Sequence, residues 1–489
     1  MWISDEVRAI LSPFPIFFNN LDLTNWLFPK QDKGRGLLER EITMITVPGR
    51  PGGIITGKRT PARFISQEVL IACESAEELR KKLEELNEIL HTETSEPLQF
   101  GDELDRTYFA MYAGAQEGYE IDGFYTATIN FLCSDPYKYA EPKKIPFADS
   151  AVTMYNNGTV EVEPIITINV ASPSTFLSLG DGTEKFNQIG RQIDVSNEEP
   201  YNKYTEVFDR LGNNLTGWAI ADEIDGGTVQ GSFLTDGQGF RANSYGATST
   251  LWRGPALKQS LPSLTQDFRI DAFITVKQEA TNQFGRAEVY LLNAAGERIA
   301  KLAMKNTGEL NSSNIGEINI RGIDDSHNII QTAGVRPRLW NDFYGVLRLE
   351  RIGNKFTAYI SRIDKGIYNT AWSGTFTDYE GLYLDPLAAI QIHVGQSGAN
   401  TFISDMAIHR VIVYRVNDPL ANQVPNIVEA GDEVVFDHVN KNILINGESR
   451  IDLKDFAGRY FTLPKGKNTL YMLPSDIGTA KIEIRERYR

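Results

Sequence analysis

Helical periodicity is confined to one stretch of this 489-residue chain, and this limits the possible folds more than any other feature of the sequence. The stretch begins near Ser75, which has the capping-box spacing to Glu78. Its apolar residues recur at intervals of four, three and four, and therefore share one helix face: Leu79, Leu83, Leu86 and Leu90. We predict an amphipathic helix that ends at about residue 90 and covers a sheet; a partner-binding helix is the alternative.

The remainder of the chain has the pattern of short strands joined by turns. It contains 41 glycines and 21 prolines, and 10% of its residues are aromatic. Apolar and polar residues alternate over 270–276 and 390–394, which is typical of strands. Gly353-Asn354 and Asn446-Gly447 are hairpin signals. The predicted fold class is therefore mainly β, with one helix in an α+β N-terminal domain and β-sandwiches after it.

Charge and cysteine content exclude several classes of protein. The net charge of −15 argues against duplex DNA as a ligand, because phosphate binding needs a positive surface. Two cysteines, Cys73 and Cys133, exclude a disulfide scaffold. The apolar runs fall short of the roughly 18 residues that span a membrane. The first residues lack the pattern of a signal peptide, so we expect folding in a cytoplasm.

The usual signatures of catalysis are missing from the sequence. It has no nucleophile elbow, P-loop or H-E-x-x-H motif, and its five histidines (91, 327, 393, 409 and 438) are far apart. Glu223 and Asp225 have the spacing of two carboxylates on one strand face, as a glycosidase needs, but a polar hairpin edge is the favoured interpretation. Asp324, Asp325 and Asp378 are calcium candidates, for which solvated loops are the simpler interpretation. We predict no enzyme activity, no cofactor and no metal site.

Sugar binding is better supported than sugar cleavage. Carbohydrate sites need aromatic faces for stacking together with amides and carboxylates for the hydroxyl groups. The middle of the chain contains Trp218, Trp252, Trp340 and Trp372, each of which is more simply a core residue. Trp252 and Trp372 lie beside predicted loops, and with Tyr245 they are the candidate glycan-binding residues.

Three segments of the N-terminal region resemble the distal tail proteins of long-tailed phages (siphophages) of Gram-positive bacteria. They are residues 47–53 (VPGRPGG), 101–108 (GDELDRTY) and 131–139 (FLCSDPYKY). The C-terminal region resembles the galectin-like sandwich of that family. The matching segments are 429–437 (EAGDEVVFD), 445–447 (ING) and 461–468 (FTLPKGKN). The order and spacing of these segments, rather than any single motif, carry the resemblance.

The resemblance covers about residues 1–200 and 418–489 and leaves a long middle segment unaccounted for. That segment has its own strand pattern, and residues 340–354 (WNDFYGVLRLERIGN) are similar to concanavalin- or laminin-G-like jelly rolls. Insertion into a sandwich is tolerated when its entry and exit lie close together. The predicted domains are an N-terminal α+β ring-forming domain, a discontinuous galectin-like sandwich and an inserted carbohydrate-binding-like jelly roll: 1–145, 146–202 with 418–489, and 203–417.

The resemblance implies a structural role at the tail tip of a virion. The N-terminal domain would form a hexameric ring that joins the tail tube to the tail-associated lysin, the receptor-binding apparatus and other baseplate proteins, assembled in the host cytoplasm. Gly49, Arg50 and Gly52 are the candidate ring contacts, and an ordinary turn is the alternative. The insert would bind host cell-wall polysaccharide, and DNA would pass through the ring without being bound. A free-standing multidomain carbohydrate-binding protein is the alternative function.

Overall fold

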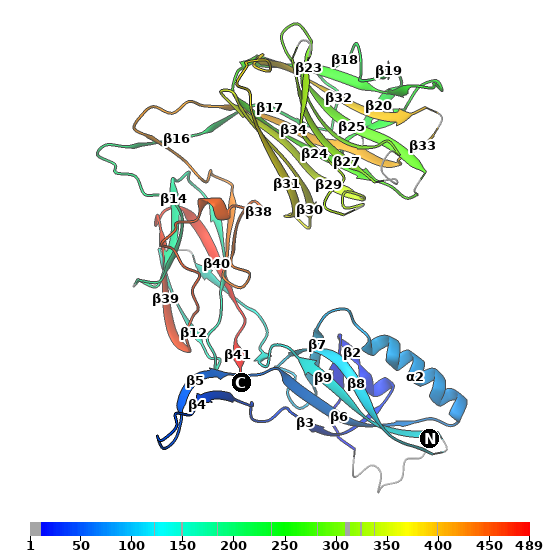
Figure 1. The fold of residues 1–489 in the computed structure, drawn as a ribbon, viewed down its shortest axis with the longest axis vertical. Coiled ribbons are helices and arrows are strands. Elements are labelled where there is room, and N and C mark those ends of the chain that lie inside the picture. Colours follow the sequence, from blue (N-terminus) through cyan, green and yellow to red (C-terminus); the bar gives the residue numbers. More distant parts are fainter. Residues whose placement is uncertain are drawn as a thin grey trace.

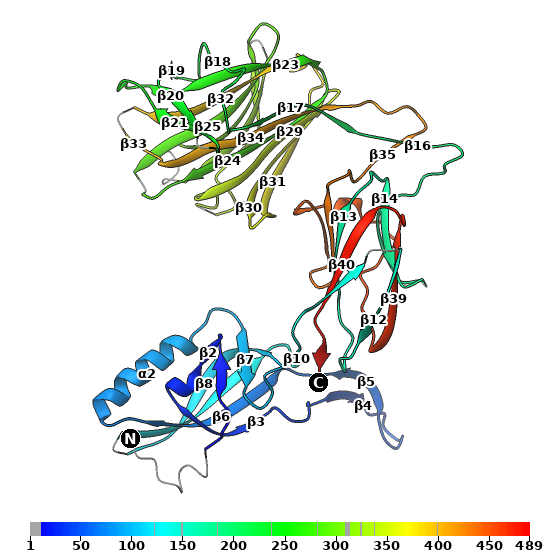
Figure 2. The same cartoon turned by 180° about the vertical axis from the view of Figure 1, so that it is seen from behind.

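The computed structural model describes residues 11–121, 123–147, 150–182, 184–235, 237–280, 282–308, 313–322, 325–336, 338–398 and 400–489. The described residues form mostly strands and one α-helix, so the predicted fold class is confirmed. Figure 1 shows a helix-covered sheet at the bottom, a large sandwich at the top and a small sandwich between them. Figure 2 shows the same three bodies from behind.

The N-terminal sheet has seven strands in the order β2-β1-β7-β8-β9-β6-β3. Helix α2 (Ala76–Leu90) lies against it, with Leu79, Leu86 and Leu90 buried in a shared core. The Ser75 hydroxyl accepts the Glu78 N–H at 3.2 Å, which confirms the predicted helix start. The other elements are β1 (Ile16–Phe18), β2 (Leu21–Asp22), η1 (Leu23–Asn25), β3 (Phe28–Lys33), β6 (Arg63–Ala72), β7 (Glu96–Phe100), β8 (Tyr108–Ile121) and β9 (Phe124–Cys133).

A two-stranded hairpin projects from the N-terminal sheet and pairs with no third strand among the described residues. It consists of β4 (Glu41–Ile45) and β5 (Ile54–Arg59), and every residue of β4 is exposed. Figure 1 shows it extending away from the sheet on the side opposite α2. Six large apolar side chains on it are about half exposed: Ile42, Met44, Ile45, Val47, Ile54 and Ile55.

The small sandwich is built from two separate parts of the chain. Its sheets have the orders β11-β40-β13-β36-β37-β38 and β12-β39-β14-β15. Strand β13 begins at Ile165, directly after Pro164, which has no N–H to donate to a ladder. The strands and the short helix are β11 (Lys143–Phe147), β12 (Ala151–Asn156), β13 (Ile165–Val170), β14 (Phe176–Gly180), β15 (Phe186–Gly190), β36 (Glu433–Asp437), β37 (Asn442–Ile445), β38 (Glu448–Ser449), η2 (Ile451–Leu453), β39 (Gly466–Leu473) and β40 (Gly478–Ile484).

Two short strand pairs connect the bodies. The chain leaves the small sandwich through β16 (Glu199–Tyr201) and returns through β35 (Gln423–Pro425), and these strands pair in parallel. Entry and exit of the intervening segment therefore run side by side (Figure 2). At the other end, β10 (Lys138–Tyr139) pairs with β41 (Arg487–Tyr488), which fastens the C-terminal residues to the end of the N-terminal region.

The large sandwich consists of an eight-stranded and a ten-stranded sheet around the largest hydrophobic cluster. Alternate residues face that core, such as Ile270 and Ala272 in β24 and Val289 in β25. The eight-stranded sheet contains β17 (Tyr204–Leu211), β20 (Ser232–Thr235), β21 (Phe240–Ser244), β24 (Phe268–Lys277), β29 (Phe343–Ile352), β30 (Lys355–Asp364), β31 (Ile367–Thr377) and β34 (Asp405–Val416). The ten-stranded sheet contains β18 (Ala219–Ile220), β19 (Gly227–Val229), β22 (Trp252–Gly254), β23 (Ala256–Thr265), β25 (Gln283–Leu292), β26 (Arg298–Asn306), β27 (Ile315–Arg321), β28 (Ser326–Thr332), β32 (Leu387–Ser397) and β33 (Thr401–Phe402).

The two sandwiches touch through the β37–β38 hairpin. Arg348 of β29 donates to both carboxylate oxygens of Glu448, at 2.8 and 3.0 Å. The Tyr368 N–H donates to the carbonyl of Gly447 at 3.1 Å. A Cβ on Gly447 would lie 1.9 Å from the carbonyl oxygen of Gly366, so this contact requires glycine. Among the described residues, no helix is both long and apolar enough to cross a membrane.

Candidate functional site

A charged network covers the outer face of the ten-stranded sheet, the face turned away from the core. Strands β25, β26 and β27 place apolar side chains in the core and the intervening ones on this outer face. The outward side chains include Glu288 and Tyr290 of β25, Lys301 of β26, and Glu317 of β27. Glu288 is nevertheless fully buried, because another part of the chain lies over it.

The covering segment is residues 221–229, which follows β18 and ends with β19. Ile224 is buried and packs with Ala256, which anchors the segment on the sheet. The backbone is held by side chains beneath it: Arg286 donates to the Asp225 carbonyl at 2.6 Å and Gln391 to the Glu223 carbonyl at 2.8 Å. Glu223 and Asp225 lie in the part of the segment that forms no strand, so the polar hairpin edge that the sequence favoured for them is wrong.

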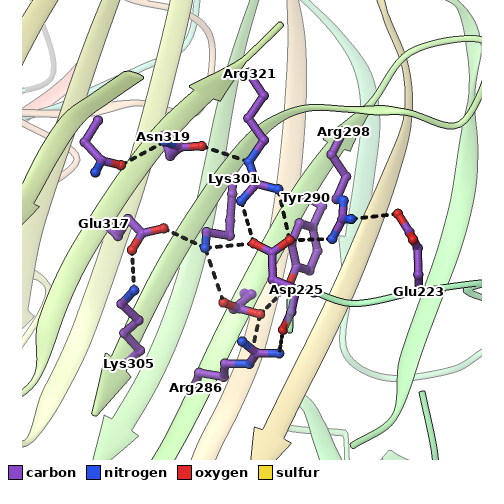
Figure 3. A network of polar contacts seen from close by, with 12 residues as sticks. Glu223, Asp225, Arg286, Tyr290, Arg298, Lys301, Lys305, Glu317, Asn319 and Arg321 are labelled. Carbon is purple, nitrogen blue, oxygen red and sulfur yellow. Dashed lines mark hydrogen bonds and ion pairs between the residues drawn. The ribbon is translucent and has the colours of Figure 1, made fainter. Parts of the chain in front are cut away.

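The Asp225 carboxylate lies at the centre of the network (Figure 3). Arg321 approaches it with both Nη atoms, Arg298 donates to Oδ1, and Lys301 donates to Oδ2 at 3.0 Å. Burial alone would raise the pKa of Asp225, but the hydrogen bonds from Arg321 and the charge of Lys301 hold it well below its usual range. Asp225 is therefore an ionised structural carboxylate.

The network continues along the strands in alternating signs of charge (Figure 3). Lys301 also contacts Glu317 at 2.6 Å, and Glu317 in turn pairs with Lys305. Beneath the segment, Arg286 lies 3.2 Å from Glu288, which accepts the Tyr290 hydroxyl. Sequence reasoning missed these residues. Their signal was a polar or charged side chain at every second position of 286–290 and 317–321, together with the two lysines, Lys301 and Lys305, that lie four residues apart on one strand.

This arrangement is unsuited to glycoside hydrolysis through Glu223 and Asp225. A general acid needs a raised pKa, and a catalytic pair needs room for the sugar between the two groups. Asp225 instead has a lowered pKa and is enclosed by three cationic side chains, while Glu223 accepts from Arg298 at 2.7 Å. The two carboxylates serve as ion-pair partners.

One end of the network opens into a polar groove of about 630 Å³. Arg298 and Arg321 border it on the side of the sheet, and Glu297, Asp325 and Asp385 border it on the side of the loops. Asn293 links two of these acids, because its amide donates to Glu297 and to Asp385, both at 2.8 Å. Asp325 accepts the Tyr383 hydroxyl at 2.7 Å, a bond that lowers the pKa of Asp325. This volume lies within the range of small-ligand pockets.

The structure does not bring the three aromatic glycan candidates together. Trp252 begins β22 of the ten-stranded sheet. The Arg286 guanidinium lies over the Trp252 ring, 4.6 Å from the ring centre. Tyr245 packs against Phe402, with ring centres 5.5 Å apart, and burial raises its pKa. Trp372 lies on β31 at the edge of the other sheet and is 37% exposed.

Most of the remaining candidates from the sequence are buried in the packing or hold a turn. Trp340 is fully buried and Trp218 packs against the core. Burial lowers the pKa of His393 and of His438 to about 4, so both are neutral near pH 7. Asp378 accepts the N–H groups of Gly381 and Tyr383, at 2.8 and 2.9 Å, and so holds a turn. Asp324 lies outside the described residues.

The ring-contact candidates lie at the tip of the β4–β5 hairpin. Gly49 and Gly52 have φ values of +80° and +79°, and a Cβ at either position would meet nothing within 4 Å. Both glycines are therefore required by the turn rather than by crowding. The Arg50 N–H donates to the Val47 carbonyl at 3.1 Å, and its side chain is exposed.

Both ends of the chain match models of phage tail families. Residues 22–133 match the phage tail protein RIFT-related domain, and residues 405–488 match the C-terminal domain of the siphovirus-type tail component. The distal tail protein of Bacillus phage SPP1 is 32% identical over 163 residues. That alignment covers 33% of this chain and 64% of the relative, which is less than two thirds of its length. These matches confirm the resemblance found in the sequence.

Two solved structures of phage proteins are also similar to parts of the chain. The SPP1 Dit protein, described as a paradigm of the hub adsorption apparatus in phages that infect Gram-positive bacteria, is 29% identical. The alignment has a TM-score of 0.35 and covers 37% of this chain and 75% of that one. The CBM2 module of an evolved Dit from Lactobacillus casei BL23 phage J-1 is 17% identical, with a TM-score of 0.39 and coverage of 45% and 98%.

Proposed function

We propose that this chain, which resembles siphophage distal tail proteins at both of its ends, is a structural component of a phage tail tip. It forms a ring that joins the tail tube to the tail-associated lysin, the receptor-binding apparatus and other baseplate proteins. The observation that carries this proposal is the pair of family matches in chain order, at residues 22–133 and 405–488. The role is architectural and needs no catalytic site.

The proposal divides the chain into an N-terminal domain (1–145), a galectin-like sandwich (146–202 and 418–489) and an inserted domain (203–417). Three separate hydrophobic cores support this division, one in each body of Figure 1. The parallel pair β16–β35 supports an insertion, because it brings the two ends of the inserted segment together.

The β4–β5 hairpin supplies one side of the ring contact in this proposal. An isolated two-stranded hairpin is marginally stable in water, and this one also exposes six large apolar side chains. A ring requires two different surfaces that meet between neighbouring copies. The second surface is β8, because no described strand pairs with it beyond Ala110 on the side of β7. A second copy of the chain, with Gly49, Arg50 and Gly52 near the contact, covers the hairpin.

The inserted domain supplies the adsorption function by binding cell-wall polysaccharide of the host. Its mixed polar groove offers both donors and acceptors, as sugar hydroxyls require. Among the aromatic candidates, Trp372 presents the most accessible ring for stacking, whereas Trp252 and Tyr245 flank one loop and are more enclosed. The protein belongs to the virion tail, is assembled in the host cytoplasm and lets DNA pass through the ring.

Solution mass by light scattering, with negative-stain images of the same full-length sample, tests the ring. We expect a hexamer of six times 54.8 kDa with a central hole. The double variant Met44→Glu, Ile55→Glu should be monomeric, because it places charges on two side chains paired across the hairpin. Val195→Glu, Phe456→Glu is the control, since both side chains are highly exposed elsewhere.

A monomer at high concentration that also fails to assemble with tail-tube protein would contradict the ring. A hexamer that the hairpin variant leaves intact would keep the ring and contradict only the hairpin as its contact surface. A monomer that binds purified walls would favour the free-standing carbohydrate-binding protein.

A further inference from the structure

The groove beside Asp225 has the chemistry to select among glycans by charge. Its two guanidinium groups are already paired, Arg321 with Asp225 and Arg298 with Asp225 and Glu223. The three remaining border carboxylates, Glu297, Asp325 and Asp385, form no ion pair with another described residue and accept hydrogen bonds from neutral side chains instead. The groove therefore has a net negative charge.

We propose that this groove is the glycan subsite of the large sandwich and that it takes an uncharged, polyhydroxylated sugar in preference to one bearing a carboxylate or phosphate. This inference rests on the glycan-binding part of the proposed function. A sugar hydroxyl both donates and accepts, so it can donate to Glu297 or Asp385 and accept from an arginine. An anionic group would face three carboxylates, and the two arginines of the groove are already paired with other carboxylates.

The rigidity of the groove supports this assignment. Arg321 donates to both oxygens of Asp225 and, through Nε, to Asn319 at 2.9 Å, so its orientation is determined before any ligand arrives. Asn293 similarly orients Glu297 and Asp385, while its own Oδ1 accepts the N–H groups of Ala295 and Glu297. Groups held in place in this way lose little conformational freedom on binding.

The groove border contains no aromatic side chain among the described residues, and this has a consequence for affinity. Without stacking, a single site relies on hydrogen bonds that exchange with water and is weak. A ring of several copies would present several such grooves to one polymer, and avidity would then supply the adhesion. Binding to a polysaccharide should therefore be much tighter than binding to its trisaccharide.

The test uses the full-length chain on a glycan array of neutral hexose and N-acetylhexosamine oligosaccharides, with trigalacturonic acid and poly(glycerol phosphate) as anionic probes. Calorimetry then measures the probes that bind. We expect a neutral oligosaccharide to bind at least tenfold more tightly than either anionic probe. The double variant Glu297→Ala, Asp385→Ala should bind the neutral oligosaccharide at least tenfold more weakly. Asp364→Asn, which changes an exposed acid on the other sheet, should leave that affinity unchanged.

A charge-only variant separates the selectivity from the fold. Glu297→Gln, Asp385→Asn keeps one acceptor oxygen and the size of each side chain but removes two negative charges. Its affinity for the neutral ligand should stay within about threefold of that of the parent chain. Its affinity for trigalacturonic acid should rise threefold or more. Thermal unfolding of both double variants within a few degrees of the parent chain shows that the sandwich remains folded.

The outcomes distinguish this inference from the function on which it rests. If binding of a neutral sugar survives Glu297→Ala, Asp385→Ala, the groove is not the glycan subsite, and the glycan-binding function remains in place. Tighter binding of an anionic probe overturns the selectivity in the same way. No binding of any probe or of purified walls overturns the glycan-binding function, and the inference falls with it, while the ring measured by light scattering is unaffected.

Discussion

The outer faces of the two sheets of the large sandwich have the same arrangement, an aspartate that lies between basic side chains. On the eight-stranded sheet, Asp271 accepts from Arg269 at 2.6 Å and from Arg348 at 2.7 Å. On the ten-stranded sheet, Asp225 accepts from Arg298, Lys301 and Arg321. In both places burial would raise the carboxyl pKa, and the neighbouring cations hold it far below its usual range.

The difference lies in what completes each network. Arg348 donates from Nη1 to Glu448 and shares Nη2 between Glu448 and Asp271, and because Glu448 belongs to the small sandwich, protein closes the Asp271 network. Asp225 comes from a segment of the same sandwich, and its network ends at a groove of about 630 Å³. One charged face is thus used to dock two sandwiches, while the other remains available to a ligand. Similar residues acquire different roles because different parts of the chain cover them.

Removing the buried carboxylate should have the largest effect. Asp271→Asn leaves Arg269 and Arg348 facing each other without the intervening charge, and Asp271 is buried. Breaking a buried pair in this way costs about 3–5 kcal/mol. We expect a loss of that size in the free energy of unfolding, measured by urea denaturation, against Asp364→Asn as a near-neutral control. A loss below about 1 kcal/mol would show that the network is dispensable.

Mild acid should act on the two sandwiches through their buried histidines. His393 lies in the large one and His438 in the small one, and each pKa falls from 6.5 to about 4 on folding. A depressed histidine pKa means that the unfolded chain binds the proton first, so stability is lost as the pH falls from 6.5 towards 4. At pH 5 the loss is about 2 kcal/mol for each histidine.

Calorimetric scans at pH 7 and pH 5 measure this effect, and His393→Gln identifies its origin. The variant should flatten the pH dependence of the large-sandwich transition and leave that of the small sandwich unchanged. An equal slope in parent and variant would contradict burial of a neutral His393. The aspartates do not contribute in this window, because their depressed pKa values cause losses only below about pH 4.

Asp225→Asn should have a smaller effect than Asp271→Asn, because the Asp225 side chain is 20% exposed and water can reach its three cations. We expect a loss of about 1–2 kcal/mol in the free energy of unfolding. Protease cleavage within residues 221–229 should also become faster, since the segment loses its main charged anchor. An effect as large as that of Asp271→Asn would show that solvent access does not distinguish the two networks.

Glu448→Gln should have the smallest effect on the free energy of unfolding. It should have the largest effect on how the two sandwiches are held relative to each other. The pair with Arg348 is partly exposed, so the expected loss is about 1 kcal/mol or less. X-ray scattering should show a broader distribution of distances between the sandwiches, and Glu483→Gln, on a different pair of the small sandwich, should not. Unchanged scattering would mean that the backbone contact at Gly447 alone holds the junction.

Much of the local structure follows from residue pattern. The helix at Ala76–Leu90 was predicted with its cap, because Ser75 and Glu78 act over one turn. The Asn446-Gly447 turn was predicted because a type of turn is chosen by the residues within it. The site was less predictable. Trp252, Trp372 and Tyr245 were chosen by residue type and, for the two tryptophans, by a position beside predicted loops, whereas the proposed groove combines residues from four segments that lie far apart in the sequence.

The mainly β class, the single helix and the resemblance of both ends to one family could be predicted from the residues, since they depend on short-range periodicity and on motifs in chain order. The residues alone did not reveal that Glu223 and Asp225 are ion-pair partners, that Arg348 meets Glu448 across two sandwiches and that the β4–β5 hairpin pairs with no third described strand. These features need the folded chain, because the energy of a charge depends on what surrounds it, and those surroundings come from strands that are neighbours in space and not in sequence.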